Sequence, residues 1–108
     1  MDARTMRRRF LAGLGSGLRV VWPILSVLLA LMVAAGLVIG VLEGWPVLDA
    51  LYFTFVSGLT IGYGDLVPKR QVSRALAIAI GVCGVLVTAL VAAVAVKALG
   101  TALSDDER

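Results

Sequence analysis

The sequence has 108 residues, of which 60% are hydrophobic and only 16% are charged, and its mean hydropathy is +1.00. A water-soluble domain of this length cannot bury so much apolar surface, so the composition predicts a membrane protein. One cysteine, Cys83, excludes an intramolecular disulfide, and with no histidine present a zinc or haem site is not expected. We expect neither an enzyme nor a bound cofactor.

The net charge of +3 is concentrated at the start of the chain. Five arginines precede the first apolar stretch: Arg4, Arg7, Arg8, Arg9 and Arg19. No aromatic residues alternate with the 7–9 cluster, so it predicts a membrane-surface anchor for anionic lipid rather than a nucleic-acid site. We expect residues 1–19 to be a flexible or interfacial cytoplasmic segment, in which a short amphipathic helix is one alternative.

Two long uncharged runs follow, each long enough to cross a bilayer. Residues 20–42 would give roughly 34 Å of helix, and residues 75–96 would give roughly 33 Å. We predict an outer helix over 20–42 and an inner helix over 72–99. Gly36 and Gly40 would let another helix approach the outer helix closely, although such glycines are also common in membrane helices generally.

A shorter apolar segment lies between the two runs. Glu43, Gly44, Trp45 and Pro46 end the first helix, and residues 46–58 predict a helix of only about half a bilayer thickness. Non-helical backbone at that depth persists only where protein buries it or where it lines a water-filled path. We therefore expect the loop that follows to face a pore.

The distribution of basic residues predicts the topology. Lys and Arg number seven on the two terminal sides (4, 7, 8, 9, 19, 97 and 108) and three in the central loop (69, 70 and 74). The positive-inside tendency then places both termini in the cytoplasm of a multi-pass protein of the cell membrane, plasma or inner. Residues 101–108 are expected to be a polar, frayed cytoplasmic tail.

The central segment 60–65, with the sequence TIGYGD, carries the chemistry. Glycines at alternate positions, Gly62 and Gly64, permit the left-handed backbone that turns successive carbonyls toward one axis. Ile61 and Tyr63 are expected to point away from that axis and to pack against the short helix. The oxygens expected to replace the water shell of a cation are the Thr60 hydroxyl and the carbonyls of Thr60, Ile61, Gly62 and Tyr63. One chain supplies one oxygen per level, so a cyclic homotetramer is required.

TIGYGD between a half-length helix and a full-length helix resembles the potassium-channel signature. Residues 20–100 are similar in layout to the two-transmembrane prokaryotic potassium channels. The resemblance implies an all-α membrane fold in which two transmembrane helices flank a re-entrant pore helix and an extended selectivity filter. It also implies a homotetramer that conducts K⁺ passively, with K⁺ as permeant ion and no nucleic-acid partner.

The resemblance also assigns roles around the filter, which it places at residues 60–64. Asp65 would support the filter from behind. Leu59 stands where the family usually has Thr or Ser, and Val56 stands where some bacterial members have glutamate. Tyr52, at the position of a family tryptophan, would then donate a hydrogen bond to Asp65, or would instead pack at a subunit contact.

On the inner helix, the resemblance places a gating hinge at Gly84, with Gly81 as a rival. The alternative for these glycines is close helix packing. The residues expected to line the central cavity are Val85, Thr88 and Ala92, and those expected at the inner mouth are Val96 and Gly100.

Four other interpretations stay open at this point. Two of them keep the same fold: a weakly selective cation channel, and the pore part of a larger gated channel. The other two are one repeat of a transporter and a helical-hairpin adaptor without transport activity. The tyrosine and both glycines of GYG argue against the weakly selective channel and the transporter, and the half-length helix argues against the adaptor.

Overall fold

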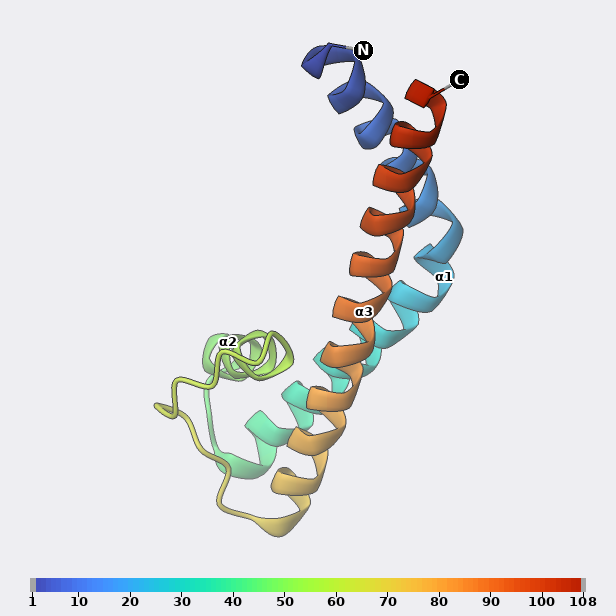
Figure 1. Cartoon of the computed structure of the whole chain (residues 1–108). Coiled ribbons are helices and arrows are strands. Elements are labelled where there is room, and N and C mark those ends of the chain that lie inside the picture. Colours follow the sequence, from blue (N-terminus) through green and yellow to red (C-terminus); the bar gives the residue numbers. More distant parts are fainter. Residues whose placement is uncertain (1, 108) are drawn as a thin grey trace. The chain divides into compact units, whose positions relative to one another are not determined.

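The computed structural model describes the backbone of residues 2–107 and the side chains of residues 2–104. Within that part the chain is entirely helical apart from two connections, with the order α1 (Ala3–Glu43), α2 (Val47–Gly58) and α3 (Gln71–Glu107) (Figure 1). Both α1 and residues 71–104 of α3 are long and apolar enough to cross a membrane. The predicted all-helical membrane fold with two long apolar helices is confirmed.

The two long helices extend beyond the predicted spans. α1 begins at Ala3 rather than near residue 20, and α3 continues to Glu107 instead of ending near residue 99. The limits of an uncharged run show where charged side chains begin, and backbone hydrogen bonding continues past them. At the start of α1 the Asp2 carboxylate accepts the Thr5 N–H at 2.8 Å, and this bond lowers the pKa of Asp2.

The basic segment is therefore helical in its backbone, and so is the tail that was expected to fray. Residues 3–19 are part of the continuous helix α1 and form neither a flexible segment nor a separate short helix. The side chains of the acidic residues Asp105, Asp106 and Glu107 lie outside the described part.

The chain forms two compact units, each built from parts of both long helices. The first unit comprises Met1–Leu25 and Ala89–Arg108. In it the start of α1 and the end of α3 run antiparallel, so that both terminal regions lie at the same end of this unit (Figure 1). A Cβ added at Gly13 would lie 3.2 Å from the Ala98 Cβ, and one at Gly17 would lie 2.6 Å from a Val94 methyl. Glycine permits this close pairing.

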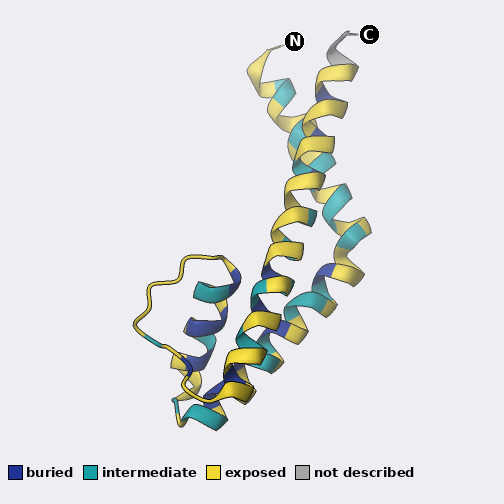
Figure 2. Cartoon of the chain, turned by 60° about the horizontal axis from the view of Figure 1, so that its bottom comes forward, coloured by how far each residue is buried: buried dark blue, intermediate teal, exposed yellow. Residues whose placement is uncertain are grey.

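The second unit, Ser26–Thr88, contains α2 and the central loop. Its core joins all three helices through four buried side chains: Met32, Ile39, Phe53 and Ile80. The predicted close approach at Gly36 and Gly40 is confirmed, and α2 is the neighbour. A Cβ at Gly40 would lie 2.6 Å from the Ala50 Cβ, and one at Gly36 would lie 2.9 Å from the Thr54 Cβ. α2 buries residues against the long helices, while residues 59–65 of the loop after it are exposed (Figure 2).

Exposed apolar side chains continue along α3. They include Ile78, Val82, Val85, Val96 and Leu99. In water so much exposed apolar surface would be unfavourable, whereas lipid tails or further protein cover it without penalty. This surface agrees with a membrane protein.

Candidate functional site

The end of α2 determines where the TIGYGD segment starts. α2 begins after Pro46, carries Asp49 in its first turn, and ends at Gly58 after 12 residues. The carbonyl of Val56 then accepts the N–H of Ile61 at 2.9 Å and that of Gly62 at 3.4 Å. These bonds satisfy a carbonyl that the end of the helix would otherwise leave unpaired. The first half of the segment is thereby fixed to the C-terminal turn of α2.

The backbone of the segment alternates. Thr60, Gly62 and Gly64 have φ values of 62°, 62° and 80°. Ile61 and Tyr63 are not among the residues with positive φ. Left-handed backbone at Gly62 and Gly64 is what the sequence predicts. A Cβ at either glycine would meet no atom within 4 Å, so the requirement for glycine here is conformational rather than steric.

Positive φ at Thr60 was not predicted. It is the only non-glycine residue with positive φ in the part of the chain that the structure describes. A β-branched residue in this region is strained by about 1–3 kcal/mol. Its hydroxyl donates to the Leu59 carbonyl at 2.6 Å. Nothing in the sequence signals this, because threonine ordinarily occupies the negative-φ regions.

The segment is exposed along its whole length. All six residues from 60 to 65 are exposed, including 48% of Ile61 and 68% of Tyr63. The expected packing of these two side chains against α2 is therefore incomplete in a single chain. A hollow of about 160 Å³, lined by Tyr63 and by α2 residues that include Tyr52 and Val56, lies behind the segment.

Tyr52 and Asp65 line the same hollow, and the hydrogen bond between them stays a prediction. The Asp65 carboxylate accepts the N–H of Leu66 at 3.1 Å. Val56 is half-buried and Leu59 is exposed, and neither side chain offers a polar partner because both are aliphatic.

The residues assigned to the cavity and the inner mouth lie on exposed surface of α3. They are Val85, Thr88, Ala92, Val96 and Gly100. Of these, Val85 is brought near the segment, because it lines with Thr60 an apolar hollow of about 400 Å³. Thr88 lies in the same unit, whereas the other three belong to the first unit.

Gly84 is buried against the end of α2. A Cβ added there would lie 2.6 Å from both the Cα and the carbonyl carbon of Gly58 and would overlap its oxygen. The close-packing alternative therefore describes Gly84 in this structure, and its hinge role stays a prediction. Gly81 has nothing within 4 Å of an added Cβ.

One contact near the segment was missed. The Glu43 carboxylate, at the end of α1, accepts the backbone N–H groups of Lys69 and Arg70, the latter at 3.1 Å. These two hydrogen bonds fix the loop between Asp65 and α3 to the end of α1. The sequence indicates Glu43 only as the end of a span. The only signal was an acidic residue at one span end and two basic residues before the next span.

Comparisons with known proteins point to ion channels. A family model described as "Ion channel" matches residues 26–101. Potassium channel, subfamily K, member 13 of Danio rerio is 41% identical over 71 residues, which cover 65% of this chain. Two pore potassium channel a of Oryza sativa subsp. japonica is 52% identical over 44 residues, 41% of this chain. Two-pore potassium channel 1 of Arabidopsis thaliana is 61% identical over 33 residues, 31% of this chain.

The matched regions are small parts of those relatives. They cover 17% of the Danio protein, 13% of the Oryza protein and 9% of the Arabidopsis protein. No solved structure gives a significant match to the chain.

Proposed function

We propose that the chain, which belongs to the ion channel family, forms a potassium-selective channel. The channel would conduct K⁺ passively across the cell membrane. The relatives it resembles are named as potassium channels. The observation that carries the proposal is the alternating positive φ at Thr60, Gly62 and Gly64. Alternation of this kind suits a stack of carbonyl oxygens that replaces the ion's water shell.

The proposed filter needs further copies of the chain. One segment supplies one oxygen at each level, so we propose a homotetramer with four segments around a common axis. The incomplete cover of Ile61 and Tyr63 supports this assembly, because neighbouring copies would bury them. The exposed face of α3 that carries Val85, Thr88 and Ala92 would line the cavity below the filter. Val96 and Gly100 would line its inner mouth.

Orientation and lipid contact complete the proposal. The antiparallel pairing in the first unit brings both terminal regions to one end of that unit, which suits two termini on one side of the membrane. The excess of basic residues at that end favours the cytoplasmic side. Arg7, Arg8 and Arg9 would contact anionic headgroups there.

Reconstitution in planar bilayers tests the proposal. With a K⁺ gradient across the bilayer and an opposed Na⁺ gradient, we expect a reversal potential near the K⁺ equilibrium value. A reversal potential near zero would instead indicate a weakly selective cation channel. Absence of current from protein that is shown to be inserted and tetrameric would contradict the channel proposal itself.

A further inference from the structure

Thr54 lies in the second half of α2, on the side that packs against α1. Its side chain is fully buried, and its hydroxyl donates to the Ala50 carbonyl at 2.7 Å. A Cβ added at Gly36 would overlap the Thr54 hydroxyl oxygen and would lie 2.9 Å from the Thr54 Cβ. Glycine at position 36 therefore lets the backbone of α1 lie directly against this side chain.

This contact is one of a pair on successive helical turns. Four residues further along α1, a Cβ added at Gly40 would lie 2.6 Å from the Ala50 Cβ. Ala50 and Thr54 are also four residues apart, so they share one face of α2. The hydrogen bond from Thr54 to the Ala50 carbonyl joins the two contacts. α2 is thereby fixed on α1 at two adjacent turns, and the Thr54 hydroxyl takes part in that fixation.

A hydroxyl fits the contact with Gly36 better than a methyl group would. Because the hydroxyl has its acceptor on Ala50, its burial leaves no polar group unpaired. A threonine bonded to the carbonyl four residues earlier also bends its helix slightly. Valine has a similar outline, but its methyl group is larger than the oxygen and cannot make this bond. Thr54→Val would therefore move α2 away from α1.

Val56, two residues after Thr54, connects α2 to the TIGYGD segment. Its carbonyl accepts the N–H groups of Ile61 and Gly62 at 2.9 and 3.4 Å. Both Thr54 and Val56 lie within the hydrogen-bonded part of α2, so a displacement at one carries the other with it. A change in the distance between α1 and α2 would therefore reach the start of the segment.

We propose that Thr54 is a positioning residue for the proposed filter. Its hydroxyl, packed on Gly36, sets the separation of α1 and α2. Through Val56 this separation determines where the carbonyls of Ile61 and Gly62 lie. The inference rests on the proposed function, because it concerns the filter of the proposed channel.

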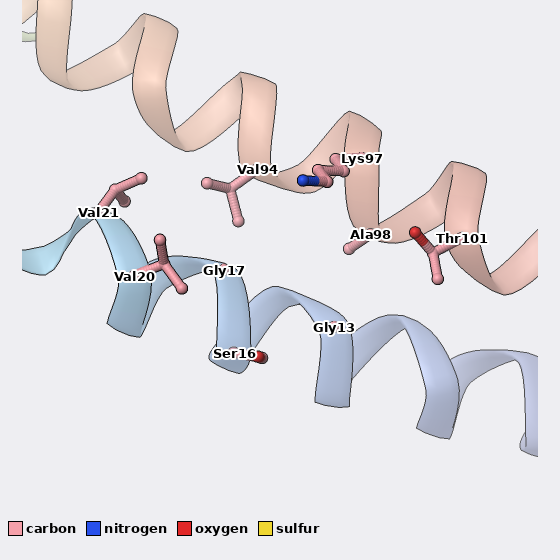
Figure 3. Close-up of a pocket in the computed structure, with 9 residues that line it drawn as sticks. All are labelled: Gly13, Ser16, Gly17, Val20, Val21, Val94, Lys97, Ala98 and Thr101. Carbon is pink, nitrogen blue, oxygen red and sulfur yellow. The ribbon is translucent and has the colours of Figure 1, made fainter.

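The first unit supplies a matched control. Thr101 of α3 also lies opposite α1, but it lines a pocket of about 340 Å³ (Figure 3). The close contacts with glycines of α1 are made there by two apolar residues, Ala98 and Val94. The larger methyl group of Thr101→Val therefore has space beside it. This variant makes the same chemical change as Thr54→Val in the other unit.

Amide hydrogen exchange of the full chain, measured by NMR, tests the position of the segment independently of conduction. We expect Thr54→Val to accelerate exchange at Ile61 and Gly62 about tenfold. Thr54→Ser keeps the hydroxyl and should retain the native rates, as should Thr101→Val. Thr54→Ala removes the hydroxyl without adding bulk, so it should accelerate exchange severalfold even where valine prevents assembly. Native rates in both Thr54→Val and Thr54→Ala, or equal acceleration in Thr54→Ser, would overturn the proposal.

Reversal potentials under opposed K⁺ and Na⁺ gradients test the consequence for selectivity. We expect Thr54→Val to lower the ratio of K⁺ to Na⁺ permeability about tenfold, with native ratios in Thr54→Ser and Thr101→Val. Ile80→Val, which shortens a buried side chain of α3 in the same unit, should lower the unfolding temperature and leave the ratio unchanged. An equal fall in Ile80→Val would overturn the proposal in favour of general stability.

The same recordings separate the two proposals. A native protein without K⁺ selectivity would contradict the proposed channel. Native K⁺ selectivity that Thr54→Val retains in full would contradict the positioning role of Thr54 alone.

Discussion

Gly84 of α3 packs directly against the backbone of Gly58, the last residue of α2. Both glycines are buried, and a Cβ on Gly84 would overlap the carbonyl group of Gly58. The C-terminal end of α2, from which the TIGYGD segment departs, is therefore seated on α3 at a position that tolerates no side chain. A small displacement at this contact would move the start of the segment.

Gly84→Ala is expected to destabilise the protein by about 1–3 kcal/mol, because the added methyl group meets backbone atoms that cannot rotate away. Gly81→Ala is the matched control, since it adds the same group on the same helix where no atom lies within 4 Å. That control should be neutral or stabilising by up to about 1 kcal/mol through helix propensity. Thermal unfolding in detergent, followed by circular dichroism, measures both variants.

Equal unfolding temperatures for the two variants would contradict the close contact. The stabilities of Gly84→Ala and Gly81→Ala also decide how a change in open probability is interpreted as evidence for a hinge. A changed open probability in Gly84→Ala reports a hinge only if the stability of the variant is unaltered. The same change in Gly81→Ala, at a site without steric conflict, would assign the hinge to Gly81.

Tyr52→Phe removes the hydroxyl that is predicted to bond Asp65, which lines the same hollow, and leaves the ring in place. We expect a severalfold change in the rate of slow inactivation, because the Asp65 carboxylate then retains only the Leu66 N–H at 3.1 Å. A partly exposed hydrogen bond of this kind is worth about 0.5–1.5 kcal/mol. Single-channel recordings measure the rate, and a double-mutant cycle with Asp65→Asn isolates the pair. Additive effects in that cycle would show that the two side chains act independently.

Glu43→Ala should loosen the loop that follows the segment. The lost carboxylate leaves the N–H groups of Lys69 and Arg70 without their acceptor, and a hydrogen bond to a charged group is worth about 1.5–3 kcal/mol. We expect faster amide hydrogen exchange at residues 69–70, with a smaller increase in Glu43→Gln, which keeps an acceptor oxygen. Asp49→Ala, which removes an exposed carboxylate from α2, is the control. Exchange at 69–70 that is insensitive to Glu43 would contradict the bond.

Sequence patterns predicted the features that depend on nearby residues. Uncharged runs located both long helices, and the alternate glycines Gly62 and Gly64 indicated left-handed backbone. The contact of Glu43 with residues 69–70 joins positions 26 and 27 apart, and no periodicity encodes such a pairing. Positive φ at Thr60 is imposed by the turn out of α2 against the residue's own preference. Context overrode propensity at that position, the first residue of the proposed filter.

Gly62→Ala tests the backbone of the segment directly. Within one chain no atom lies within 4 Å of an added Cβ, so the effect on the single chain comes from the left-handed conformation, which is less favourable by about 1–2 kcal/mol for an L-residue. We expect destabilisation of that size and a reversal potential shifted away from the K⁺ value. Gly15→Ala is the matched control, since that glycine is also sterically free but lies within α1 without positive φ. It should be neutral or slightly stabilising and should leave the reversal potential unchanged. If Gly62→Ala behaved like Gly15→Ala in both measurements, the alternating backbone would have no part in selectivity.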